Sequence, residues 1–300
     1  MKPCRNLPGM KQYFHYCCKG LKNDLVFVDR QEFIAGMNRI GVCWLYCREK
    51  GLPVQIIAFC LLSNHFHFVL YGEEEATELF MEYYRHLTGM WIQKHRGEKL
   101  HERLQLGHWQ ANTYERAKDK VVYTLRQTLE AGIQVTPQGY PWCSAMLMFN
   151  ENSFLEQLCE KTGDISGRRR QKMFNTTVCI PDNWTVIPNG MIWPGCYTDI
   201  SLAKNLFSGV KDYMFCLNNG NIDRAVNAEM MSERPSIPDS EVRDRARSLS
   251  QGLFGYRSVS NCSAEERIQV AKLLRKELHC GHKQLARIVM MDESELRKLV

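Results

Sequence analysis

The stretch AFCLLSNHFHFVLYG, residues 58–72, decides how the first half of this chain folds. Two runs of aliphatic and aromatic residues, each of strand length, flank the short polar turn Ser63-Asn64. Such runs, separated by a tight turn, are typical of a β-hairpin. The sequence therefore predicts two paired strands, Val54–Leu62 and Phe66–Tyr71.

Two histidines, His65 and His67, stand at the start of the second strand with one residue between them. Side chains at i and i+2 of a strand point to the same face, so both imidazoles face one side and Phe66 faces the other. Two imidazoles about 6–7 Å apart can hold one metal ion and leave positions open for other ligands. An isolated pair of this kind is equally compatible with an accidental surface pair or half of a structural zinc site.

Strand-like and helix-like stretches alternate outward from this hairpin. A short aromatic strand, Gln12–Cys18, comes first, and Asp29 is placed to cap a helix reaching about Lys50. The other expected elements are a helix at Glu74–Arg96, a strand at Leu106–Glu115, and a helix opened by Asp119 and closed by Gly132. The order β-α-β-β-α-β followed by a helix predicts an α+β fold, with a ferredoxin-like antiparallel sheet and helices on one face.

Length and charge set the wider frame. The chain has 300 residues and a formal net charge of +6, which suits more than one folded unit and permits a phosphate-rich partner without demanding one. No membrane span and no secretory signal are expected, so the 13 cysteines should stay reduced in a cytoplasmic protein. We expect a catalytic domain over 1–150, an extension and linker over 151–259, and a helix-turn-helix-like DNA-binding region over 260–300.

Several segments, in the same order and at similar intervals, resemble the HUH nucleases, and among them the single-tyrosine, REP-associated transposases of the IS200-like kind. The resemblance covers about residues 10–150. It rests on the hairpin at 58–72 and on four further segments, namely Tyr13-Phe14-His15, His108-Trp109-Gln110, YTLRQTLEAG at Tyr123–Gly132, and YPWCS at Tyr140–Ser144.

The resemblance implies the chemistry of a DNA transposase. Tyr123 falls at the position of the nucleophile, and His65, His67 and Gln127 fall at the positions of the ligands of a Mg²⁺ or Mn²⁺ ion. Tyr123 and Gln127 are four residues apart, so on a helix they share a face. A phenol leaves more readily than a serine alkoxide, which suits a linkage that must hold a DNA end and later return it. The implied product is a 5′-phosphotyrosine and a free 3′-OH, formed on single-stranded, hairpin-containing DNA.

The sequence departs from the family pattern at three places. Gln127-Thr128 stands where the family has Asn-Pro, Leu62-Ser63 stands where it has Met-Pro, and His15 lacks the usual following arginine. These departures bear on rate and metal preference. Tyr114 is the alternative nucleophile, but the residue four positions later is Lys118, which offers no amide ligand.

Candidate DNA-binding residues combine basic and aromatic side chains. They are Trp109, Tyr114 and Arg116 before the Tyr123 helix, and Arg168, Arg169, Arg170 and Lys172 in a basic run. In the C-terminal region, Gln284, Arg287, Ser294, Arg297 and Lys298 are expected to face nucleic acid. For each group, ordinary packing or a solvated surface remains the alternative.

Three functions remain open. The first is an active transposase, mobile or domesticated, that works as a monomer or homodimer on nucleoid DNA. The second is a catalytically inactive, sequence-specific DNA-binding regulator on the same fold. The third is a replication-initiation protein or relaxase, which the lack of a phosphate-binding GxxxxGK[ST] loop disfavours.

Overall fold

The computed structural model describes residues 10–18, 25–100, 103–133, 136–150, 159–219, 239–278 and 280–300. Within these ranges no helix is both long enough and apolar enough to cross a membrane. The expected domain ranges also include residues 1–9 and 220–238, which lie outside the described residues.

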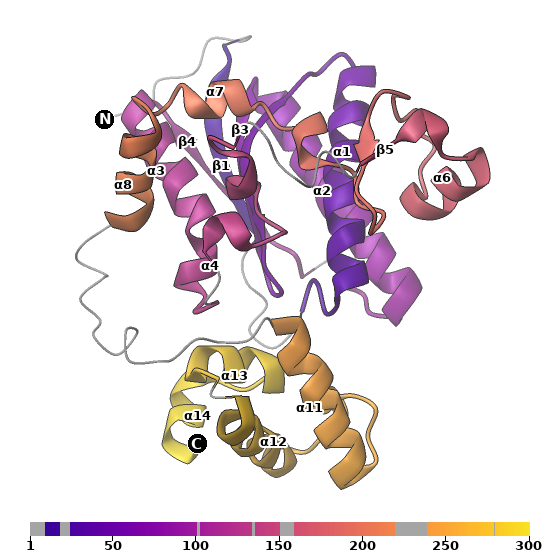
Figure 1. The fold of residues 1–300 in the computed structure, drawn as a ribbon, viewed down its shortest axis with the longest axis vertical. Helices are drawn as coiled ribbons and strands as arrows, with labels where there is room; N and C mark the ends of the chain where they lie inside the picture. The colour runs from indigo at the N-terminus through magenta and orange to yellow at the C-terminus, as the bar shows by residue number, and fades with distance from the viewer. Residues whose placement is uncertain are drawn as a thin grey trace.

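A four-stranded antiparallel sheet forms the centre of the larger part of the molecule (Figure 1). Its strands are β1 (Gln12–Cys18), β2 (Gln55–Leu61), β3 (Phe66–Gly72) and β4 (Leu106–Ala111). They lie in the order β2-β3-β1-β4, with every neighbouring pair antiparallel. The strand that carries His67 is therefore a central strand beside β1. The expected last strand is shorter than predicted, because it ends at Ala111 and does not reach Glu115.

The long helices α1 (Arg30–Glu49) and α2 (Glu74–Arg96) pack on one another and follow the sequence expectation closely. The Asp29 side chain accepts a hydrogen bond from the backbone N–H of Glu32, as an N-cap does. Gly97 ends α2 with a φ of 75°, a conformation that glycine adopts without steric cost. On β1, the hydroxyl of Tyr16 is hydrogen-bonded to Thr77, so this face of the sheet lies against α2.

The third helix, α3 (Tyr114–Leu125), covers the opposite face of the sheet, so the expectation of helices on one face is wrong. On β1, Tyr16 reaches α2, whereas its neighbour His15 contacts Tyr123 of α3, and adjacent strand residues point to opposite faces. The helix also begins earlier than Asp119, because the Thr113 side chain caps it by accepting from the Arg116 N–H. A short helix, α4 (Gln127–Glu130), continues the same path.

The segment YPWCS, residues 140–144, covers the free edge of β2. The Leu61 N–H donates to the Trp142 carbonyl at 2.9 Å, and the Phe59 N–H donates to the Ser144 hydroxyl at 2.9 Å. The Tyr140 hydroxyl donates to the Leu61 carbonyl at 3.0 Å. An exposed strand edge would leave these backbone groups unpaired, so the segment completes the sheet at the point where the chain leads into the histidine turn.

The packing divides the chain differently from the expected boundaries at 150 and 260. The first hydrophobic core runs from Tyr13 to Leu217, so most of the expected extension is part of the sheet-bearing unit. Its further elements are β5 (Glu160–Lys161), α6 (Gly167–Phe174), β6 (Thr185–Val186), α7 (Ile200–Lys204) and α8 (Val210–Asn219). A second core runs from Val242 to Leu296 and defines a C-terminal helical unit that begins before residue 260.

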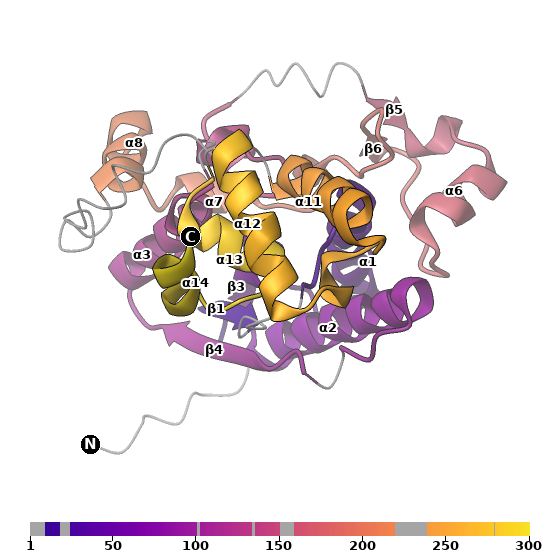
Figure 2. The ribbon, with the colours of Figure 1, turned by 90° about the horizontal axis from the view of Figure 1, so that it is seen from below.

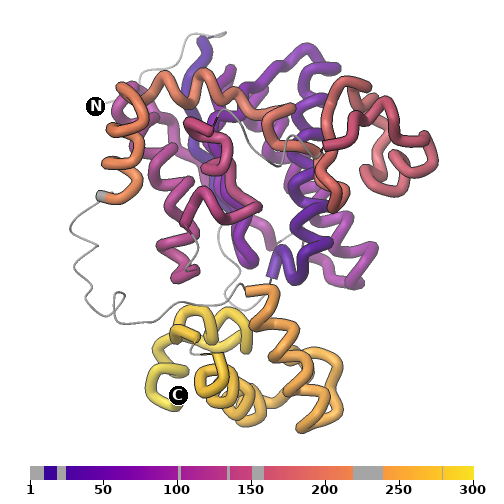
Figure 3. The backbone as a smooth tube through the Cα atoms, viewed as in Figure 1, coloured from indigo at the N-terminus to yellow at the C-terminus, as the bar shows by residue number. Residues whose placement is uncertain are grey.

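The described residues of the C-terminal unit form four α-helices and a short 3-10 helix at Val259–Asn261, and Figures 1 and 3 show the unit as a separate lobe beside one end of the sheet. The α-helices are α11 (Asp239–Phe254), α12 (Ala264–Leu278), α13 (His282–Val289) and α14 (Glu293–Leu299). Between α13 and α14, Met290 has a φ of 55°, which ends α13 sharply. Figure 2, seen from below, shows these helices lying across the end of the sheet-bearing unit.

Candidate active site

The turn Ser63-Asn64-His65 and the start of β3 place the two predicted histidines side by side. The ring centres of His65 and His67 are 5.0 Å apart, with the ring planes at 82°. Phe66 points the other way, with its ring against Tyr84 of α2 at 5.2 Å. The alternation expected from strand geometry is therefore present, and it separates the imidazole pair from the aromatic core.

The start of α4 brings an amide to this pair. The side chains of Gln127 and His65 are hydrogen-bonded to one another. The Gln127 amide nitrogen donates to the Tyr123 carbonyl at 3.2 Å. That hydrogen bond holds the Gln127 amide group beside the His65 ring.

Tyr123 lies over the histidines from α3. Its ring centre is 5.5 Å from that of His67, with the planes nearly perpendicular at 84°. The Tyr123 side chain is 38% exposed, whereas His67 is 4% exposed. The four residues expected to act together are thus adjacent, with the tyrosine accessible to a macromolecule and the histidine shielded from water.

The Nδ1 atoms of His65 and His67 make the contacts that orient the two rings. His65 Nδ1 contacts the Asn64 side-chain oxygen at 2.7 Å, and His67 Nδ1 contacts His15 Nε2 at 3.2 Å. Each ring is therefore oriented through Nδ1, which leaves its Nε2 as the candidate ligand. With the Gln127 oxygen, two imidazole nitrogens and one amide oxygen fit an open site for a divalent ion.

Burial keeps these imidazoles neutral, which is the form that binds a metal. Burial, and then the positive charge of Lys120, lowers the pKa of His15 to about 3. Burial lowers the pKa of His65 to about 4, against the raising effect of Gln127. Burial lowers the pKa of His67 well below its usual value, and the neighbouring His65, His15 and Lys120 add to this. The rings are available as ligands at neutral pH without first losing a proton.

A cleft of about 500 Å³ opens beside Tyr123. It is lined by side chains of β4 and α3, among them Trp109, Arg116, Lys120, Tyr123 and Arg126. Trp109 is 50% exposed and stacks on His15, with ring centres 5.6 Å apart. An exposed aromatic ring beside several cations is the combination that binds single-stranded nucleic acid.

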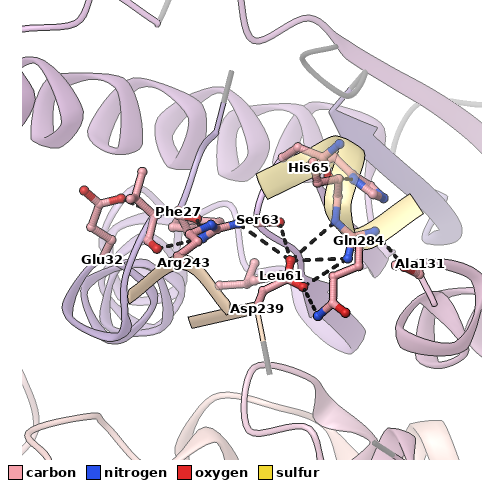
Figure 4. A network of polar contacts seen from close by, with 12 residues as sticks. Phe27, Glu32, Leu61, Ser63, His65, Ala131, Asp239, Arg243 and Gln284 are labelled. Carbon is pink, nitrogen blue, oxygen red and sulfur yellow. Dashed lines mark hydrogen bonds and ion pairs between the residues drawn. The ribbon is translucent and has the colours of Figure 1, made fainter. Parts of the chain in front are cut away.

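The C-terminal unit contacts the histidine turn through one buried carboxylate, Asp239 (Figure 4). Asp239 accepts a hydrogen bond from the Ser63 hydroxyl at 3.2 Å, and it pairs with Arg287 at 3.1 Å and Arg243 at 3.6 Å. Burial alone would raise the pKa of Asp239, but the two guanidinium groups and Gln284 outweigh it and lower that pKa. The turn that carries His65 therefore belongs to the sheet-bearing unit and is also hydrogen-bonded, through Ser63, to the C-terminal unit.

Among the expected DNA-binding residues, Trp109 and Arg116 lie in the cleft beside Tyr123. Tyr114 and Arg116 belong to the first turn of α3 and not to a strand, and Tyr114 is 52% exposed with its ring edge-on to Tyr13. The basic run Arg168–Lys172 lies in α6, apart from the site (Figure 1). Two of its members form ion pairs, Arg169 with Glu160 and Arg170 with Asp182.

The expectation that Gln284 and Arg287 face nucleic acid is wrong. Gln284 is 1% exposed and donates to Asp239 at 2.9 Å. Arg287 pairs with Asp239 and donates to the Ala131 carbonyl at 2.6 Å, so both side chains face the unit boundary. At the start of α14 the Asp292 side chain caps the helix by accepting from the Ser294 N–H at 2.8 Å. Arg297 pairs with Glu293, and Lys298 is exposed.

The sequence did not predict a role in the site for His15 or Lys120. His15 belongs to the short aromatic segment Tyr13-Phe14-His15, and both His15 and Lys120 lie against Tyr123. The signal for Lys120 was its position three residues before Tyr123, on the same helical face. Elsewhere in the described chain, Glu74, Glu78 and His108 form an exposed group whose ligand atoms lie within 4.8 Å of one another.

Comparison with known proteins adds a weak likeness. No protein-family model and no curated protein matches the chain. Among solved structures, a chain described as a REP-associated tyrosine transposase bound to a REP hairpin aligns with 49% of this chain and 84% of its own length. The identity is 12% and the TM-score is 0.33. The function proposed below therefore rests on the residues of the site and not on this alignment.

Proposed function

We propose that this chain is a metal-dependent, single-stranded DNA endonuclease and strand transferase of the HUH kind, with Tyr123 as its nucleophile. The observation that carries the proposal is the adjacency of Tyr123, His65, His67 and Gln127, which come from three separate elements. The strand order and the two strand–helix–strand crossovers are compatible with a ferredoxin-like scaffold for this site.

The proposed reaction is an in-line displacement at one DNA phosphorus atom. The Tyr123 oxygen loses its proton and forms a bond to phosphorus, and the bond from phosphorus to the 3′ oxygen breaks. The 3′ oxygen takes up a proton and leaves as a free hydroxyl, while the 5′ side of the cut stays on Tyr123 as a phosphotyrosine. The reverse step, with a 3′-hydroxyl as nucleophile, rejoins a strand and needs no other energy source.

The residues around Tyr123 have separate tasks in this reaction. When bound, a Mg²⁺ or Mn²⁺ ion would supply Lewis-acid polarisation of a non-bridging phosphate oxygen. His65, His67 and Gln127 would hold it. Trp109 would stack a base next to the scissile phosphate, and Lys120 and Arg116 would attract the backbone. We propose single-stranded DNA with a hairpin as the substrate.

The polarity of a covalent adduct tests the proposal. Purified protein is incubated with Mn²⁺ and hairpin-containing single strands whose flanks are randomised, labelled at either the 5′ or the 3′ end. A 5′-phosphotyrosine retains the 3′ label on the protein and releases the 5′ label. We expect Tyr123→Phe and His67→Ala to give no adduct, and Tyr114→Phe to give the wild-type amount.

Two results would contradict the proposal. An adduct that persists in Tyr123→Phe shows another nucleophile, and retention of the 5′ label shows the opposite chemistry. If the wild-type protein binds these strands without any adduct, and Tyr123→Phe binds equally, the chain acts as a DNA-binding regulator on the same fold.

A further inference from the structure

The third histidine, His15, lies directly beneath the proposed metal ligands. It comes from the central strand β1, and its ring is nearly parallel to that of His67, with centres 5.3 Å apart and planes at 10°. His15 Nε2 and His67 Nδ1 are 3.2 Å apart, in a region where both side chains are buried. The contact joins two residues 52 positions apart in the sequence.

The proton in this contact determines which nitrogen of His67 can bind a metal. A neutral imidazole carries one proton, so one nitrogen is a donor and the other is an acceptor. If His15 donates, His67 accepts through Nδ1 and carries its proton on Nε2, where it blocks the metal. If His67 donates from Nδ1, its Nε2 carries a lone pair that can bind a metal.

An imidazole at position 15 makes a hydrogen bond to His67 but leaves its second nitrogen buried and, among the described residues, unpaired, which costs free energy. Within the described residues, His15 Nδ1 is buried and has no hydrogen-bond partner. A phenylalanine would fill this space and stack on Trp109 without leaving a buried nitrogen unpaired, which typically costs about 1–3 kcal/mol. The one hydrogen bond that an imidazole makes here, and a phenylalanine could not, is the bond to His67.

We propose that His15 is a positioning residue, whose Nε2 accepts the Nδ1 proton of His67 and so fixes the ring and tautomer that present His67 Nε2 to the metal. This inference rests on the proposed function and deepens it, because it names the residue that prepares one ligand. Trp109 stacks on the other side of the His15 ring, so His15 contacts both the proposed base platform, Trp109, and the proposed metal ligand, His67.

The tautomer can be observed directly. The protein is labelled with ¹⁵N-histidine and saturated with Mg²⁺, and two-bond nitrogen–proton couplings report the protonated nitrogen of each ring. We expect the wild-type His67 to carry its proton on Nδ1, and His15→Phe to lose that single state. A proton on Nε2 of His67 in the Mg²⁺-saturated wild type overturns the proposal.

Metal affinity gives a second measurement that does not depend on DNA cleavage. Free Mn²⁺ is followed by electron paramagnetic resonance in a Glu74→Gln/Glu78→Gln background, which removes the exposed Glu74–Glu78–His108 group as a competing site. We expect His15→Phe to weaken Mn²⁺ binding by roughly 10- to 100-fold. His15→Gln can still accept a proton from His67 and should recover most of the affinity.

The outcomes separate this inference from the proposed function. If the wild type binds Mn²⁺ and His15→Phe binds it equally tightly, His15 has no positioning role and the proposed function stands. If the wild type binds no Mn²⁺ in this background, both the proposed metal site and the positioning role of His15 are wrong. Should His15→Phe not fold, the His15→Gln affinity and the wild-type tautomer still decide the matter.

Discussion

The ammonium group of Lys120 lies 5.6 Å from the ring centre of Tyr123 and an equal 5.6 Å from that of Trp109. One cation therefore lies between the proposed nucleophile and the proposed base platform. A phosphate that approaches Tyr123 would meet this charge at close range, in a cleft partly shielded from water. Lys120 on α3 would attract the DNA backbone, and Trp109 on the neighbouring strand β4 would stack on a base next to it.

Lys120→Ala should weaken single-stranded DNA binding and reduce its salt dependence. One lost phosphate contact lowers the slope of log affinity against log salt by about 0.7 for a single strand. Fluorescence anisotropy over a salt series measures both quantities in the Tyr123→Phe background, where no adduct forms. Arg168→Ala removes one exposed charge from α6 and should leave the slope unchanged. Equal effects of the two substitutions would place the DNA elsewhere.

Trp109→Ala should lower the affinity for single strands by roughly 5- to 150-fold, since stacking on one aromatic ring contributes about 1–3 kcal/mol per base. Trp109→Phe keeps a ring face and should retain most of the binding. The matched control is Phe215→Ala, which removes an aromatic side chain that is 65% exposed on α8. A Trp109→Ala variant that binds like wild type would argue that Trp109 only packs against His15.

The relative placement of the site residues was predictable where it depends only on their spacing within one strand or one helix. The two-residue spacing of His65 and His67 fixes a shared face in any strand, and the four-residue spacing of Tyr123 and Gln127 fixes a shared side of a helical path. The caps of α1 and α2 were equally local, since Asp29 and Gly97 act on their own helix ends.

The parts that escaped prediction depend on contacts between distant segments. His15 becomes a partner of His67 only because β1 inserts between β3 and β4. Gln284 is of a residue type that often reads DNA bases, yet its side chain points inward and donates a hydrogen bond to the buried carboxylate of Asp239. Nothing in the local pattern around either residue reveals such a partner.

Asp239→Asn should detach the C-terminal unit from the histidine turn. The substitution keeps the shape of the side chain but leaves Arg243 and Arg287 as buried cations without a countercharge, and breaking such a pair typically costs about 3–5 kcal/mol. Small-angle scattering should report a larger radius of gyration, and urea denaturation should report lower stability. Asp244→Asn, which removes an exposed partner of Arg247 on the same helix, should change neither. An unchanged radius in Asp239→Asn would show that apolar contacts alone hold the units together.

Acidification should unfold the sheet-bearing unit well before its carboxylates are all protonated. His15 has a pKa of about 3 in the folded protein against 6.5 for the free side chain, and the pKa of His67 is lowered well below 6.5. Well above pH 6.5 these histidines are neutral in both the folded and the unfolded state, so they contribute nothing to the pH dependence. As the pH falls below 6.5 the unfolded chain binds protons that the folded chain cannot, so stability is lost by at most about 1.4 kcal/mol per pH unit for each histidine.

Urea denaturation at a series of pH values between about 6.5 and the onset of acid unfolding measures this slope. His15→Phe removes one of the three protons that His15, His65 and His67 take up on unfolding, so its stability should fall less steeply with pH than that of the wild type, whatever its stability at neutral pH. The slope is the deciding quantity, because a packing defect shifts the whole curve without changing how it depends on pH. Parallel curves for the two proteins would show that His15 is protonated in the folded state over this range, against the burial that its position on β1 imposes.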